Sequence, residues 1–199
     1  VRFDEAIDEA EKADLLIMST KDKCLLPQLI GVPVSIKDVV KVKDTITTLG
    51  MQKLCKSEIV KHYNEESHII EVLRINGAIP FCLTNVPQGL FAFETANQIY
   101  NSSMNPWNIE RTTGGSSGGC GGLVASFSSV FSFCSDLAGS IRQPAHCNGI
   151  YGLKPSSSRI TNVGQLKLSG DEYTGYKAFL SAPWFLARNF DDCLLLAQT

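Results

Sequence analysis

The sequence predicts a single α/β domain in which helices cover both faces of a sheet. Three observations support this prediction. Segments typical of strands and helices alternate in the order strand, helix, strand, helix, strand, which is the pattern of parallel strands joined by crossover helices. The length of 199 residues fits one domain with a sizeable core. An apolar content of 44% with 19% charged residues is ordinary for a globular protein.

The first predicted elements are a helix and a strand. Apolar residues fall on one face of the segment from Phe3 to Leu16, with acidic residues on the other, which predicts a helix. The β-branched run Val32 to Ile36 follows Gly31 and predicts a strand. The segment from Asp38 to Lys61 has no clear period and carries Lys41, Lys43, Lys53 and Lys56, and we interpret it as a solvated excursion.

A helix and a second strand follow. Asn64 is expected to cap the helix, and Asn76-Gly77 supplies a left-handed stop. The segment from Ala78 to Thr84 predicts a strand parallel to the first, with Pro80 near its start because proline cannot donate a ladder hydrogen bond. The stripe of the helix that faces the core is expected to consist of Ile69, Val72 and Leu73.

The remaining elements are shorter. They are a glycine-opened helix over Gly119–Phe127, a strand over Val130–Cys134, a short helix or turn over Ser140–Asn148, strands over Ile150–Leu153 and Ala182–Ala187, and a closing helix over Asp191–Gln198. The chain begins at Val1 and stops inside this apolar helical pattern without a cap. We therefore expect residues 1–199 to form one partial domain of a longer protein.

Composition excludes several classes of function. The formal net charge of −2 and a pI near 5.9 give no electrostatic basis for binding nucleic acid. No apolar run approaches the roughly 18 residues that span a bilayer. Seven cysteines without a Cys-x-x-Cys pair argue against a disulfide framework and against structural zinc, and favour an intracellular, reducing location.

Two glycine- and serine-rich stretches and one lysine carry the chemistry. They are Thr113-Gly-Gly-Ser-Ser-Gly-Gly119, Ser135-Asp-Leu-Ala-Gly-Ser-Ile-Arg-Gln-Pro144 and the strand Val32-Pro-Val-Ser-Ile-Lys37. Two serines and a lysine that converge make a hydrolase that needs no histidine. A phosphate-binding loop is disfavoured, because Gly-Lys-Ser/Thr and Gly-x-Gly-x-x-Gly are absent. A flexible linker and a backbone surface that closely approaches a substrate remain open on composition alone.

These motifs resemble those of the amidase signature family. The order Gly-Gly-Ser-Ser-Gly-Gly, Gly-Ser-Ile-Arg-x-Pro-Ala and Gly-Leu-Lys-Pro is similar, and Ser116 and Ser140 lie 24 residues apart. Within the family, Thr84-Asn-Val-Pro-Gln88 and Asn105-Pro-Trp107 look most like fatty-acid amide hydrolases. The resemblance covers residues 31–188. It implies the mixed sheet of that family, with helices on both faces.

The resemblance assigns a role to each motif residue. It implies that Ser140 is the nucleophile, that Ser116 is a bridging serine preceded by a cis peptide bond from Gly115, and that Lys37 is the base. A serine hydroxyl is a poor nucleophile until a neighbour removes its proton. Lysine can act as that base only if its pKa falls far below about 10.4, and the apolar strand before Lys37 favours such a fall.

Further residues would support this triad. The resemblance implies that Ser117 hydrogen-bonds to Lys37, and Asp136 and Arg142 flank the turn and could pair. His146 is interpreted as structural and Cys147 as a small buried thiol. The oxyanion hole would consist of the backbone N–H groups of Leu137, Ala138, Gly139 and Ser140. Leu90 and Phe91 match positions that line an acyl pocket, with plain core residues as the alternative.

The chain departs from the family pattern in three places. Ala138 replaces a glycine of the oxyanion turn, which would strain the backbone if that position needs a positive φ. Cys120 stands where an acidic residue is usual. Ser128-Ser129 and Phe131-Ser-Phe133 replace a glycine-rich connection.

The resemblance implies a serine amide hydrolase that cleaves fatty-acid amides through an acyl-enzyme. It implies no cofactor and no metal, and a small lipid amide as the substrate. Association with a membrane surface, through segments outside residues 1–199, and a homodimer are left open. Two alternatives are another amidase of the family, such as the glutaminase subunit of a tRNA-dependent amidotransferase, and an inactive truncated homologue.

Overall fold

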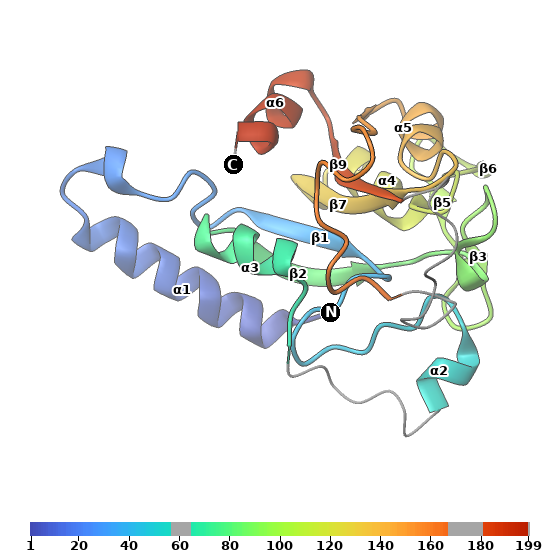
Figure 1. Ribbon diagram of the computed structural model, residues 1–199, viewed down its shortest axis with the longest axis horizontal. Coiled ribbons are helices and arrows are strands. Elements are labelled where there is room, and N and C mark those ends of the chain that lie inside the picture. Colours follow the sequence, from blue (N-terminus) through green and yellow to red (C-terminus); the bar gives the residue numbers. More distant parts are fainter. Residues whose placement is uncertain (57–64, 167–180, 199) are drawn as a thin grey trace.

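The computed structural model describes residues 1–56, 65–166 and 181–198, and its centre is a five-stranded mixed sheet (Figure 1). The strand order is β2-β1-β7-β9-β8. Strands β2, β1 and β7 are parallel to one another, whereas β9 runs antiparallel to both β7 and β8. The predicted mixed sheet with parallel neighbours is therefore confirmed.

The sheet strands are β1 (Pro33–Lys37), β2 (Ile79–Thr84), β7 (Phe131–Asp136), β8 (Tyr151–Gly152) and β9 (Ala182–Ala187). Two small hairpins are formed by β3 (Ala96–Asn97) with β4 (Asn101–Ser102), and by β5 (Met104–Asn105) with β6 (Asn108–Thr112). The helices are α1 (Phe3–Ser19), α2 (Gln52–Lys56), α3 (His68–Ile75), α4 (Gly118–Ala125), α5 (Arg142–Asn148) and α6 (Phe190–Gln198). Short 3₁₀ turns cover Lys23–Leu25 and Gln88–Leu90.

The predicted elements are present, with bounds shifted by at most a few residues. Gly77 ends the region after α3 with a φ of 86°, as expected for a left-handed stop. Pro80 is the second residue of β2, which is an edge strand of this sheet, so its missing N–H removes no ladder bond there. The described N-cap of α3 is Ser67, and the predicted cap Asn64 lies outside the described residues.

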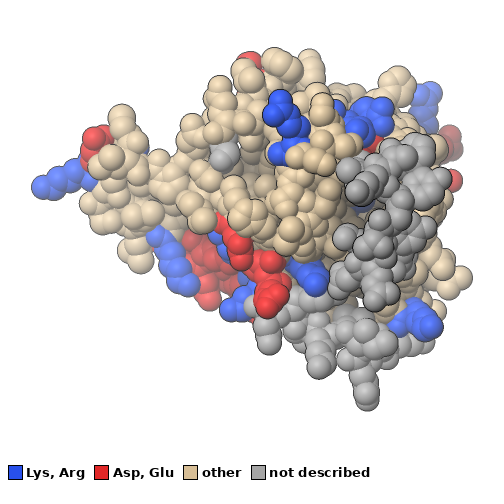
Figure 2. All heavy atoms as spheres, viewed as in Figure 1, with Lys and Arg blue, Asp and Glu red and all other residues tan. Residues whose placement is uncertain are grey.

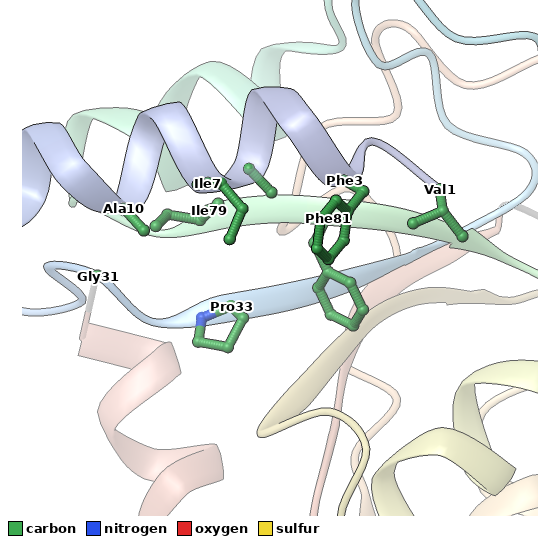
Figure 3. A pocket seen from close by; sticks show the side chains of 9 residues that line it. Val1, Phe3, Ile7, Ala10, Gly31, Pro33, Ile79 and Phe81 are labelled. Carbon is green, nitrogen blue, oxygen red and sulfur yellow. The ribbon is translucent and has the colours of Figure 1, made fainter.

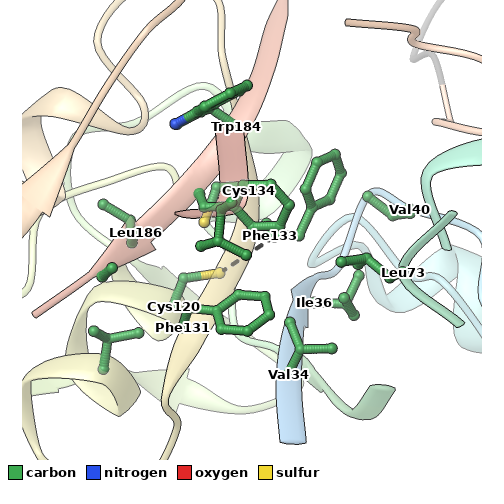
Figure 4. Close-up of a cluster of buried hydrophobic side chains, with 14 of the residues drawn as sticks. Val34, Ile36, Val40, Leu73, Cys120, Phe131, Phe133, Cys134, Trp184 and Leu186 are labelled. Carbon is green, nitrogen blue, oxygen red and sulfur yellow. Dashed lines mark hydrogen bonds between the residues drawn. The ribbon is translucent and has the colours of Figure 1, made fainter. Parts of the chain in front are cut away.

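Helices cover both faces of the sheet. Register places Ser35 and Lys37 of β1 on the same face as Cys82 and Thr84 of β2. Helix α4 lies on this face, because its Cys120 contacts Thr84. On the other face, Leu73 of α3 lies beside Val34 and Ile36 (Figure 4).

The interpretation of residues 38–61 as a solvated excursion is wrong for its first part. Val39, Val40, Val42 and Leu49 are at most 3% exposed and belong to the hydrophobic core. The buried carboxylate of Asp38 accepts hydrogen bonds from the backbone N–H and the hydroxyl of Thr48, which closes the loop on itself. Exposed lysines such as Lys43 and Lys53 lie in the same segment, and they made its buried apolar residues hard to recognise from the sequence.

The serines that replace a glycine-rich connection form a buried polar cluster. Ser35 donates to Ser129 at 2.9 Å and pairs with Ser132, so these hydroxyl groups satisfy one another. The neighbouring Phe131 and Phe133 pack edge-on against Phe185 of β9. The residues that replace the glycine-rich connection therefore stabilise the packing of β1, β7 and β9 against one another.

Helix α1 packs on the edge strand β2 and leaves an apolar hollow of about 270 Å³ (Figure 3). Its walls include Pro33 and Ile79, which begin β1 and β2, so the hollow lies at the opposite end of the strands from Lys37 and Thr84. It is lined by Val1, Phe3, Ala6, Ile7, Ala10, Gly31, Pro33, Ile79 and Phe81, which offer no chemically reactive group.

Ion pairs join α1 to α3. Arg74 contacts both Glu9 and Glu66, and Arg2 contacts Glu9. In Figure 2, acidic and basic side chains lie next to one another over the region of α1 and α3. In the part of the chain that the structure describes, no helix has the length and apolarity needed to cross a membrane.

Candidate active site

Lys37 lies at the end of β1, where its side chain is completely enclosed. Neighbouring parallel strands end beside it, with Thr84 closing β2 and Asp136 closing β7. Ligand sites of parallel sheets form at this carboxyl edge. The lysine is 1% exposed, and its Nζ donates to the carbonyl of Ser135 at 3.1 Å and to Oγ of Ser116 at 2.9 Å.

The three residues predicted for the triad form one hydrogen-bonded line. Ser116 Oγ donates to Ser140 Oγ at 2.9 Å, and Lys37 Nζ donates to Ser116 Oγ at the same distance. Ser116 is 1% exposed, whereas Ser140 is only partly buried. The line therefore runs from an enclosed amine to a hydroxyl that solvent can reach. Because a hydroxyl both donates and accepts, the same distances allow proton movement in either direction.

Burial lowers the pKa of Lys37 from 10.5 to about 8, although nearby Cys134, Cys120 and Asp136 each oppose this shift. The direction agrees with the requirement that a lysine base lose its proton easily. At pH 7 the ammonium form still predominates, because that pH lies below the shifted pKa. The neutral amine becomes the main form only above about pH 8.

Glycines let the Ser116 loop lie against neighbouring backbone. A Cβ on Gly115 would come within 2.5 Å of the Ala92 carbonyl oxygen, and one on Gly119 within 2.5 Å of the Asn85 backbone. The peptide bond from Gly115 to Ser116 is cis, as the resemblance implied. The sequence analysis considered that these glycines let a substrate approach the backbone closely. At Gly115 and Gly119 the group that approaches is the protein's own backbone.

The turn before Ser140 is organised by the carboxylate of Asp136. This buried side chain accepts from the backbone N–H of Gly139 at 2.7 Å and of Ile141 at 3.1 Å, and Arg142 binds both of its oxygens at 3.0 Å. The predicted pair of Asp136 and Arg142 is confirmed. Burial would raise the pKa of Asp136, but Arg142 and the backbone donors outweigh it and lower the pKa to about 2.

This arrangement narrows the predicted oxyanion hole. The Gly139 N–H is engaged by Asp136, whereas the N–H groups of Leu137, Ala138 and Ser140 have no hydrogen-bond acceptor among the described residues. The positive φ of the turn, 128°, is at Gly139, and Ala138 does not adopt a positive φ. The strain considered for the alanine is therefore absent.

Ser117 does not form the hydrogen bond to Lys37 that was predicted for it. Its hydroxyl is buried without a hydrogen-bond partner. Cys147 is only half-buried and accepts from Gln143 Nε2 at 3.4 Å, so it is less enclosed than predicted. His146 lies exposed on α5.

The two residues predicted for an acyl pocket differ in their surroundings. Leu90 packs against the hydrophobic core, whereas Phe91 is 82% exposed, so a core role for Phe91 is wrong. Phe93 is 57% exposed, and its ring lies 3.5 Å from the position that a Cβ on Gly139 would occupy. Exposed aromatic surface therefore lies next to the turn that carries Ser140.

Two residues that hold the serine loops were not predicted from the sequence. Gln143 Oε1 accepts from the Gly115 N–H at 2.6 Å and so joins the two glycine-rich stretches. Thr95 donates to the Gly114 carbonyl at 2.8 Å and accepts from the Gly118 N–H at 3.0 Å. Gln143 lies inside the second motif and could have been considered, but nothing local marks Thr95. Among the described residues, no His, Cys, Asp or Glu cluster could hold a metal ion.

The charge on Asp136 leads to a prediction about stability. We expect Asp136→Asn to lower the free energy of unfolding by about 2 kcal/mol at pH 7, because buried donors lose a charged acceptor. The wild-type contribution is complete above the unfolded carboxyl pKa near 3.9 and is lost as pH falls through about 2. Urea unfolding at pH 7 and in acid measures this, with the exposed Asp14→Asn as control. Equal losses at pH 7 and pH 2 would contradict it.

Known proteins resemble this chain in both sequence and structure. The family model described as Amidase matches residues 1–199. Fatty acid amide hydrolase 1 of Caenorhabditis elegans is 39% identical over 69% of this chain and 23% of its own length. One of the subunits of a glutamyl-tRNA(Gln) amidotransferase from Clostridium acetobutylicum is 34% identical over 100% of this chain and 38% of its own length. A solved fatty acid amide hydrolase superposes with a TM-score of 0.85 at 31% identity, covering 97% of this chain and 32% of that one.

Proposed function

This chain belongs to the amidase family, and we propose that it carries the catalytic residues of a serine hydrolase that cleaves amide C–N bonds. The observation that supports the proposal is the line from Lys37 through Ser116 to Ser140, with 2.9 Å at both hydrogen bonds. The chain spans less than two fifths of the length of these two relatives. The rest of each relative has no counterpart in these 199 residues.

The proposed reaction begins at Ser140. Neutral Lys37 takes a proton from Ser116, Ser116 takes one from Ser140, and the freed Ser140 oxygen attacks the amide carbonyl carbon. The N–H groups of Leu137, Ala138 and Ser140 stabilise the negative oxygen that forms. The C–N bond then breaks, and the proton held by Lys37 returns through Ser116 to the leaving amine.

Water completes the cycle. It attacks the acyl group on Ser140 and gives its proton to the same line of side chains, and the acid departs as the serine regains its hydrogen. Each bond broken is matched by one formed. The half-buried position of Ser140 supports this role, because both an amide and the later water can reach it.

A lipid amide is the substrate class that we propose. Apolar side chains are exposed at and near the catalytic turn, with Leu137 44% and Phe93 57% exposed, and Phe91, two residues before Phe93, is 82% exposed. A long acyl chain would bury this surface at about 25 cal/mol per Å², whereas glutamine has no comparable apolar group. The alternative, a glutaminase subunit, is favoured by the 34% identity with an amidotransferase subunit over the whole chain.

We expect an alkyl fluorophosphonate to label the protein once per chain, with mass spectrometry placing the label on Ser140. We also expect oleamide to be hydrolysed in preference to glutamine, because its acyl chain can cover the exposed aromatic side chains. Release of ammonia from both substrates measures this preference. Hydrolysis of glutamine alone would contradict the lipid proposal and leave the hydrolase, whereas folded protein that never takes the label would contradict the hydrolase itself.

A further inference from the structure

Two buried thiols lie around the side chain of Lys37. Cys134 is two residues beyond Ser132 on β7, and Ser132 lies opposite Ser35 on β1, so alternation places Cys134 on the same sheet face as Lys37. Thr84 pairs with Lys37 from the other neighbouring strand. Cys120 of α4 lies over this row, and its Sγ is 2.9 Å from the Thr84 hydroxyl.

The enclosure of these groups is complete. Cys120 and Cys134 are both 0% exposed, and Lys37 is 1% exposed. Figure 4 shows Cys120 reaching from its helix toward β7, where Cys134 lies, and its Sγ is 3.9 Å from the Phe133 carbonyl. Water does not screen charges in such a place, so a proton on one group strongly affects its neighbours.

We propose that Cys120 is the acid–base partner of Lys37, a positioning residue that exchanges one proton with the lysine. At low pH the pair is a thiol with an ammonium, and at high pH it is a thiolate with a neutral amine. Between these limits one proton remains on the pair, which is then either a thiol with a neutral amine or a thiolate with an ammonium. The proton leaves sulfur as it arrives on nitrogen, so the net charge of the pair does not change. This inference rests on the proposed function, in which the neutral amine is the base.

The surroundings of Cys120 suit a thiolate. Burial alone would raise the pKa of its thiol, but the neighbouring polar groups of Cys134, Ser132 and Thr84 and the charge of Lys37 outweigh burial, so that the pKa falls below the ordinary value. Burial raises the pKa of Cys134, which therefore stays a thiol, and its Sγ donates to the Ser132 carbonyl at 3.7 Å. The other titratable groups that face this pair are Cys82 of β2, whose pKa burial raises to about 12, and Asp136 of β7.

The Cys120 thiolate is expected to make Lys37 a less available base. A thiolate beside Lys37 stabilises its ammonium form and keeps fewer molecules in the neutral form that the reaction needs. A serine at position 120 could still hydrogen-bond to Thr84 but would not ionise in this range. Removing the thiol should therefore release the lysine proton at lower pH.

The test compares Cys120→Ser and Cys120→Ala with wild type, and uses Cys193→Ser as the matched control. Cys193 is a buried thiol on α6, a helix that packs on β8 and β9. The first readout is the ultraviolet absorbance of thiolate as pH rises, which needs no activity. We expect both Cys120 variants to lose a thiolate that forms near neutral pH and the control to keep it. Lys37→Met should also lose it, because the thiolate then lacks its ammonium.

The second readout is the pH dependence of Ser140 labelling by the fluorophosphonate. We expect the midpoint, near pH 8 in wild type, to fall by at least about half a unit in both Cys120 variants and not in Cys193→Ser. An unchanged absorbance titration and an unchanged midpoint would overturn the inference. Absence of labelling in every protein would overturn the proposed hydrolase instead, and the absorbance would still decide the pairing of Cys120 with Lys37.

Discussion

Replacing Ser140 with alanine is expected to abolish covalent labelling and to lower amide hydrolysis by about 10⁴-fold or more. The change removes only the oxygen that the proposed reaction uses as its nucleophile. Ser140 is partly exposed and its hydroxyl hydrogen-bonds to Ser116, so its loss leaves no large cavity. Fluorophosphonate labelling and ammonia release from oleamide measure the two effects.

Ser116→Ala provides the contrast that separates a nucleophile from a relay. This variant keeps Ser140, but Lys37 loses the hydroxyl through which it reaches that residue. We expect slow labelling of Ser140 instead of none, and a rate of hydrolysis reduced by about 10²–10⁴-fold. Ser102→Ala, an exposed serine on β4, is the control that should retain full activity. Undiminished labelling of Ser140→Ala would remove this serine from the mechanism.

The proposed triad could be placed from the sequence because its motifs resemble those of the amidase signature family and each member lies in a locally recognisable motif. Lys37 ends a β-branched strand, and β-strand patterns alternate regularly enough to be found. Ser116 and Ser140 lie in glycine-rich turns, one before α4 and the other before α5. Parallel strands then bring these turns to one edge of the sheet, which follows from topology alone.

Hydrogen-bond partners that are distant in sequence could not be predicted in the same way. Asp136 was expected to pair with Arg142. Its hydrogen bond from the Gly139 N–H, however, depends on a turn whose backbone angles no sequence pattern specifies. The burial of Val40 and Val42 depends on how the loop after β1 folds over the core. Lys41 and Lys43 alternate with these valines, and they make the segment more polar in sequence than it is in its packing.

The structure gives Lys37 opposite effects on activity and on stability. An enclosed ammonium group costs free energy because burial removes it from water. The difference between pKa values of 10.5 and about 8 corresponds to about 3 kcal/mol. This cost is present in full below about pH 8, where the folded lysine must carry its proton. It disappears as pH rises through about 10.5, where the unfolded lysine is neutral too.

Lys37→Met is therefore expected to inactivate the protein and to make it more stable at pH 7. Hydrolysis should fall by about 10³-fold or more, because no base remains to take the Ser116 proton. The free energy of unfolding should rise by about 1–2 kcal/mol, which is less than the full 3 because the carbonyl of Ser135 loses a donor. Urea unfolding of both proteins at pH 7 and near pH 10 measures the difference.

The decisive measurement is how the difference in unfolding free energy between Lys37→Met and wild type changes with pH. Groups other than Lys37 and its partner Cys120 titrate equally in the two proteins, so subtraction removes their contributions, and the advantage of the methionine variant should shrink steadily between pH 8 and pH 10.5. Lys12→Met, at an exposed position of α1, should change neither activity nor this slope. The contrary result is a Lys37→Met protein whose free energy of unfolding is below that of wild type by the same amount at pH 7 and at pH 10. It would mean that the contacts of the lysine stabilise the fold and that its buried charge carries no free-energy cost. The lowered pKa on which the proposed base depends would then have no support.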